Sequence, residues 1–116
     1  MLRAFSTVLM ISISTVAFGQ EDFKSADSQL NMLYKEITQR LAGNEETLHL
    51  LTAAQRAWIA FRDAECAFSA SGVEGGSAYP EVLSSCKAGV TQKRIADFKA
   101  YLSCEEGDLA CPVPSN

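Results

Sequence analysis

One short stretch gathers the residue types that could do chemistry. Residues 54–66, AQRAWIAFRDAEC, contain the only tryptophan of the chain, two arginines, two acidic residues and a cysteine. Such a set could form a catalytic centre, a binding face or an ion-pair network inside a helix. The acidic residues Asp63 and Glu65 are two positions apart, so on a helix they point to different sides. The stretch therefore offers no paired carboxylates for general acid–base catalysis.

The rest of the chain offers no better catalytic set. The only histidine, His49, lies in a run of leucines, which favours a partly packed side chain over a general base. The adjacent acids Glu45/Glu46 and Glu105/Glu106 are typical of solvated positions. We therefore expect a protein that is not an enzyme and binds no cofactor. The alternative, a small hydrolase, would require a convergent pair of exposed carboxylates in a pocket.

The first nineteen residues have the pattern of a secretory signal peptide. Arg3 precedes an apolar run that ends near Val16, and the small residues Ala17 and Gly19 precede a predicted cleavage before Gln20. The alternative is a membrane anchor. However, serines and a threonine interrupt the run, which falls short of the roughly 20 apolar residues that span a bilayer. No cysteine lies near the cleavage point, so we expect a periplasmic or secreted bacterial protein without a membrane anchor.

Charge and cysteines limit the function further. Without Arg3, 9 basic and 14 acidic residues remain, a formal net charge of −5. This balance argues against nucleic-acid binding, which needs a basic surface. It fits a cationic partner as well as simple solubility.

Four cysteines in a small exported chain imply disulfides, and three pairings are possible. The most local pairing is favoured: Cys66 with Cys86, and Cys104 with Cys111. A zinc site is disfavoured because the chain has no C-x-x-C pair.

Periodicity places these residues on three helices. Apolar residues at three- and four-residue steps predict helices at about 23–42, 45–71 and 79–104. Asp22 or Ser25 would cap the first, Gly43 would end it, and Ser77 would cap the third. The predicted fold is all-α: a disulfide-stabilised bundle of three helices over residues 20–104, after a signal peptide (1–19) and before an acidic, proline-containing tail (105–116). The apolar stripe predicted for the second helix is Leu48, Leu51, Ala54, Trp58, Phe61 and Phe68.

Four motifs in this order resemble the LprI-like lysozyme-inhibitor family. They are ADSQLNMLYKEITQRL (26–41), AQRAWIAFRDAEC (54–66), a GGS loop with a following SSC, and VTQKRIADFKAYL (90–102). The resemblance covers most of the mature chain. The positions that match the family pattern are Asp27, Leu30, Asn31, Tyr34, Gln55, Arg56, Trp58, Arg62, Asp63, Cys66, Gly75, Gly76, Ser77, Cys86, Thr91 and Arg94.

The resemblance implies an exported helical domain, and the founding member of the family is named for inhibiting lysozyme. This chain departs from the family pattern in one respect. Many members carry a cysteine just before the first helix, whereas here none is present. Cys104 and Cys111 would then supply a different second bridge.

We interpret the motif residues as structural rather than as contacts to a partner. On a helix Trp58, Arg62 and Cys66 are successive i,i+4 neighbours and share one packed face. We expect Glu65 to pair with Arg62, and Asp63 to meet Arg94 from the third helix. Asn31 would form a hydrogen bond between helices.

Binding is expected on segments outside the packed helices. The candidates are a glycine loop with Glu74, Gly75, Gly76 and Tyr79, and the tail acids Glu105, Glu106 and Asp108. The predicted function is an exported binding protein whose loop blocks the cleft of a cationic c-type lysozyme. The alternative is an accessory or structural envelope protein that binds another periplasmic protein or peptidoglycan without inhibiting lysozyme.

Overall fold

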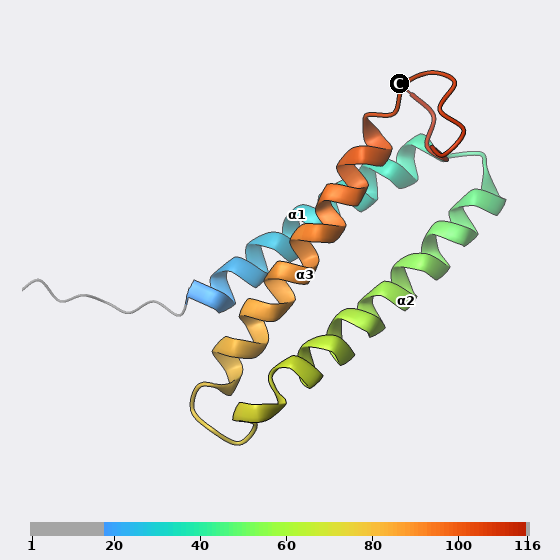
Figure 1. Cartoon of the computed structure of the whole chain (residues 1–116). Helices are drawn as coiled ribbons and strands as arrows, with labels where there is room; N and C mark the ends of the chain where they lie inside the picture. The colour runs from blue at the N-terminus through green and yellow to red at the C-terminus, as the bar shows by residue number, and fades with distance from the viewer. Residues whose placement is uncertain (1–17, 116) are drawn as a thin grey trace, which may run out of the picture.

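The computed structural model describes residues 18–115, and it describes side chains from Asp22 onward. The chain folds into α1 (Phe18–Arg40), α2 (Glu45–Ser69), the short 3-10 helix η1 (Ser71–Val73) and α3 (Tyr79–Leu102), shown in Figure 1. Residues 18–115 contain no strand, which confirms the predicted all-α fold of three helices. The predicted signal peptide lies outside the described residues except for its last two, Phe18 and Gly19, which belong to α1.

Local signals set the turn between α1 and α2. Gly43 adopts a φ of +90°, the left-handed conformation that glycine supplies at helix ends without steric cost. The next residue, Asn44, is the N-cap of α2, and its side chain accepts a hydrogen bond from the Thr47 amide. Glu45 and Glu46 follow in the first turn, where acids favour the helix dipole. The predicted boundary is thus confirmed.

The caps predicted for the other two helices are wrong. Asp22 and Ser25 lie inside α1, which begins at Phe18. The N-cap of α3 is Ala78, not Ser77, and it makes no side-chain hydrogen bond. The glycine loop continues in turns as far as Ala78, so Ser77 falls one residue too early. Pro80 sits in the first turn of α3, where its missing N–H costs nothing.

The core lies mainly between α1 and α3. These two helices pack along each other, and α3 also contacts α2, so α3 is the central helix (Figure 1). The C-terminal Val113 is 6 % exposed and belongs to this core. From α2, Leu48, Leu51 and Trp58 are only partly buried against it. The buried core residues are Ala26, Leu30, Ile37, Leu41, Ile95, Phe98 and Val113.

The apolar stripe predicted for α2 is wrong at two of its largest members. Phe61 is 56 % exposed and Phe68 is 77 % exposed. The face that α2 turns inward carries Gln55, Arg62 and Cys66 instead. A hydrogen bond, ion pairs and a disulfide hold this face against the other helices, so it needs few apolar side chains.

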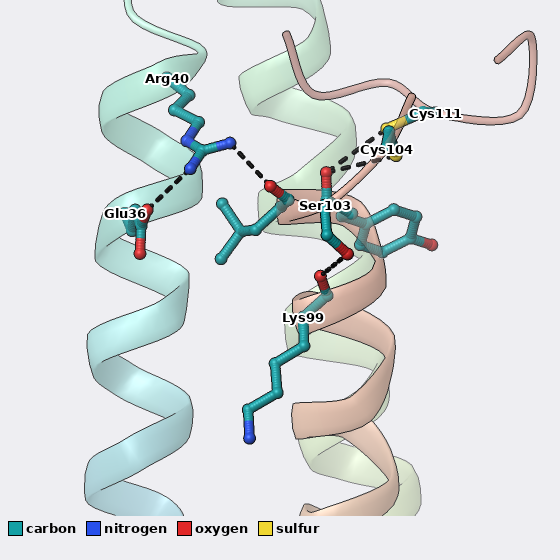
Figure 2. A network of polar contacts seen from close by, with 8 residues as sticks. Glu36, Arg40, Lys99, Ser103, Cys104 and Cys111 are labelled. Atoms are coloured by element: carbon teal, nitrogen blue, oxygen red, sulfur yellow. Dashed lines mark hydrogen bonds and ion pairs between the residues drawn. A yellow bond between two sulfur atoms is a disulfide. The ribbon is translucent and has the colours of Figure 1, made fainter. Parts of the chain in front are cut away.

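Both predicted disulfides are present. Cys66–Cys86 joins the end of α2 to the beginning of α3, and Cys104–Cys111 folds the tail back on the end of α3. Figure 2 shows how this end of the bundle is closed. Arg40 donates from Nη1 to the Leu102 carbonyl oxygen (3.0 Å) and from Nη2 to Oε1 of Glu36 (2.9 Å). The first of these bonds satisfies a carbonyl at the end of α3 that has no partner within the helix.

Candidate functional site

Three motif residues, Trp58, Arg62 and Arg94, belong to a stack in which cations and aromatic rings alternate between the helices. The Arg62 guanidinium lies over the rings of Phe23 (5.1 Å) and Trp58 (5.2 Å). The Arg94 guanidinium of α3 lies over the rings of Trp58 (5.9 Å) and Phe98 (4.7 Å), so Trp58 contacts both arginines. At the opposite end of the stack, Lys87 lies 5.7 Å from the Phe23 ring. Each cation thus gains attraction to a ring face while it joins two helices.

Carboxylates at the edge of this stack balance the charge. Arg62 pairs through Nε with Asp63 (3.0 Å) and through Nη1 with Asp27 of α1 (3.5 Å). The same Asp63 oxygen lies 3.6 Å from Nζ of Lys87. The predicted Arg62–Glu65 pair is therefore wrong. Asp27 was missed because it comes from another helix, although Phe23 and Asp27 are i,i+4 neighbours and share a face.

The predicted contact of Arg94 with Asp63 is also wrong. Arg94 donates from Nε to Oε1 of Gln55 (3.1 Å) and lies 3.8 Å from Asp97 on its own helix. Gln55 is 8 % exposed, and this bond satisfies its buried amide oxygen. Lys87 takes the place beside Asp63 because it follows the disulfide residue Cys86 directly.

The remaining motif residues serve packing or are exposed. Leu30 and Thr91 are fully buried, and the Tyr34 hydroxyl lies 3.4 Å from the Thr52 hydroxyl oxygen on α2. Asn31 is exposed and makes no interhelical hydrogen bond with the described part of the chain, so that expectation is wrong. The cations, rings and carboxylates of this stack join all three helices.

The two candidate binding segments lie at opposite ends of the bundle (Figure 1). At one end the glycine loop exposes Glu74, turns at Gly75 with a φ of +80°, and leads to the half-buried Tyr79. At the other end the tail exposes Glu105, Glu106 and Asp108. One copy therefore cannot combine the loop and the tail in a single site.

The tail end of the bundle is acidic over more than the tail. An apolar hollow of about 280 Å³ is lined by Thr47 and Leu50 of α2 together with Pro112 and Val113 of the tail. The first turn of α2 thus lies beside the tail. Five exposed acids gather at this end, which we call the acidic end: Glu45, Glu46, Glu105, Glu106 and Asp108.

The described residues offer no metal centre. Between residues 18 and 115, no three His, Cys, Asp or Glu side chains converge to hold an ion. His49 is exposed rather than partly packed, which corrects the sequence-based interpretation. All four cysteines are in disulfides and offer no thiolate. None of the described helices has the length and apolar character needed to cross a membrane.

The order of the motifs agrees with a comparison to known protein families. A family model described as "Lysozyme inhibitor LprI" matches residues 10–98. The chain belongs to the LprI family. A relative from Rhizobium meliloti (strain 1021), named "Uncharacterized protein R02472", is 31 % identical over 99 residues, 76 % of this chain and 71 % of that protein. No solved structure matches the chain significantly. The LprI match includes the cation–aromatic stack and the glycine loop, and it ends before the acidic tail.

Proposed function

We propose that this protein is an exported, non-catalytic inhibitor that binds a c-type lysozyme and blocks its cleft. The observation that carries the proposal is the match to the lysozyme-inhibitor family over residues 10–98. The two disulfides support export, because such bonds persist in oxidising compartments such as the periplasm.

The glycine loop is the proposed blocking element. It lies within the family match, protrudes from one end of a rigid bundle, and carries an exposed carboxylate, Glu74, next to Gly75 and Gly76. The Cys66–Cys86 disulfide holds both ends of this loop together, so its insertion into a cleft would cost little ordering entropy. Tyr79 at its base supplies an aromatic group of the kind that anchors interfaces.

The acidic end is proposed to attract the cationic enzyme rather than to block it. All five of its acids are solvent-exposed, and the three in the tail, Glu105, Glu106 and Asp108, lie outside the family match. Exposed charges of opposite sign raise association rates, and salt screens this effect with a Debye length of about 8 Å at physiological ionic strength. Inhibition should therefore depend on the loop at every salt concentration and on the acidic end mainly at low salt.

The test is inhibition of a c-type lysozyme by the purified oxidised protein, followed as the clearing of a bacterial cell-wall suspension. The loop variant is Glu74→Gln with Tyr79→Ala. The tail variant replaces Glu105 and Glu106 by Gln and Asp108 by Asn. Asn at position 108 retains the oxygen that accepts the Ala110 amide hydrogen bond (2.9 Å).

A matched control removes the same number of exposed acids elsewhere: Asp22→Asn, Glu65→Gln and Glu81→Gln. We expect the loop variant to lose inhibition at low and high salt. The tail variant should inhibit several-fold less strongly than the control variant, and this difference should appear at low salt only. An absence of binding by the wild-type protein at micromolar concentration in low salt refutes the proposal.

A further inference from the structure

The outer surface of α2 carries an apolar face that the rest of residues 22–115 leaves largely exposed. Leu50 is 66 % exposed, and Phe61 and Phe68 are more than half exposed. Small apolar residues join them at alternating steps of three and four along the helix, the spacing of a coiled-coil seam. We call these exposed residues the alanine face: Leu50, Ala53, Ala57, Ala60, Ala64 and Ala67, flanked by Phe61 and Phe68.

From this face we infer that the protein forms a homodimer in which α2 of one copy packs antiparallel against α2 of a second copy. Alanine at both seam positions lets two helices approach closely, and a two-fold axis makes the same face serve both copies. The inference goes beyond the proposed function, because it does not involve lysozyme.

Size complementarity is satisfied in the antiparallel register that overlaps the whole alanine face. When Ala57 lies opposite Ala60 of the second copy, Leu50 lies opposite Ala67, so each layer contains a small residue. At the flank, Phe61 then faces Ala54 of the second copy, and Phe68 faces the first turn of its α2. The bulky side chains therefore fill space that small residues leave open, as close packing requires.

Charge selects the same register. Arg56 is exposed at the other flank of the alanine face and makes no ion pair with the described part of the chain. In the register above it lies opposite Asp63 of the second copy, and the two-fold axis forms this pair twice. Only one Asp63 oxygen is used by Arg62 and Lys87. A shift of one heptad places Arg56 against Arg56, or Asp63 against Asp63, and like charges disfavour both.

The dimer would bring together the two segments that one copy holds apart. Antiparallel α2 helices place the acidic end of each copy beside the glycine loop of the other. The interface uses one helix from each copy, so it is smaller than the roughly 1,200–2,000 Å² of a standard interface, and weak association is expected.

The test is sedimentation of the oxidised protein across concentration. We expect a reversible dimer with a dissociation constant between about 1 µM and 1 mM, as small interfaces give. Ala57→Glu should raise this constant by about tenfold or more, since it buries two charges. The matched control is Ala96→Glu on α3, also an exposed helical alanine, which should leave it unchanged. Because both positions are exposed, circular dichroism should show intact folds.

Orientation is tested by oxidative cross-linking of Ala57→Cys protein mixed with Ala60→Cys protein. The antiparallel register predicts that the mixed pair cross-links faster than either protein with itself, whereas a parallel pair predicts the reverse. A wild-type protein that stays monomeric at 1 mM, or one whose association is unchanged by Ala57→Glu, overturns the inference. If the protein is monomeric but Ala57→Glu abolishes lysozyme inhibition, the face binds the enzyme instead of a second copy.

Discussion

Replacement of Arg62 tests whether the cation–aromatic stack holds the fold together. The Arg62 side chain is 9 % exposed and joins α1 to α2 through Asp27, Asp63 and the rings of Phe23 and Trp58. Both carboxylates are more than 40 % exposed, so each ion pair contributes only about 0.2–1 kcal/mol. Each cation–ring contact at this burial contributes about 1 kcal/mol. Arg62→Ala should therefore lower the free energy of unfolding by about 2–4 kcal/mol.

The assay is urea unfolding under non-reducing conditions, followed by circular dichroism at 222 nm. Fluorescence is unsuitable, because Trp58 directly contacts Arg62 and its signal would change locally. Arg62→Lys keeps the charge but loses the planar group that stacks on both rings, so it should cost about 1–2 kcal/mol. The control Lys24→Ala, at an exposed position on α1, should change stability by less than about 0.5 kcal/mol. A loss below 0.5 kcal/mol for Arg62→Ala, with lysozyme inhibition abolished, would show that this stack is a binding site.

Three further predictions concern the Cys66–Cys86 disulfide, the packing of the tail and two glycines of the turns. Replacing Cys66 and Cys86 by Ala should lower the free energy of unfolding by about 3 kcal/mol in thermal or urea unfolding, since their bridge spans 20 residues; a loss below 1 kcal/mol contradicts this. Val113→Ala should cost about 1–2 kcal/mol by urea unfolding, because the side chain is in the core; an unchanged midpoint would show that the tail does not pack. Gly43→Ala should cost about 1–2 kcal/mol because φ is +90°, whereas Gly72→Ala, at a negative φ with open space around it, should cost less than about 0.5 kcal/mol; equal effects in thermal unfolding would refute the argument.

Local signals explain what could be predicted from the sequence. Gly43 and Asn44 end one helix and begin the next, and their conformational preferences do not depend on distant residues. The disulfide pairing also followed from locality, because the bridges that form, with separations of 20 and 7 residues, are together the most local of the three possible pairings. The fold class and both bridges were therefore accessible without a structure.

The inward face of α2 could not be predicted, for a physical reason. Its apolar residues occupy two sides of the helix: Leu51 and Trp58 pack against the core, while Phe61 and Phe68 are more than half exposed. Helical periodicity detects that a helix has an apolar stripe, but it cannot decide which of two such stripes packs against the bundle. The choice is made by Arg62, whose partners come from α1. Long-range pairs of this kind depend on helix packing, which no local spacing encodes.

The position of the charges within the bundle gives ionic strength two separate effects. The cations of the stack are largely buried and attracted to ring faces, an interaction that dissolved ions reach poorly. The acids at the tail end stand in open solvent, where added salt cancels their field. The fold should therefore persist in concentrated salt while the attraction to a cationic partner disappears. Concentrated salt should thus separate the proposed partner from a protein that is still folded.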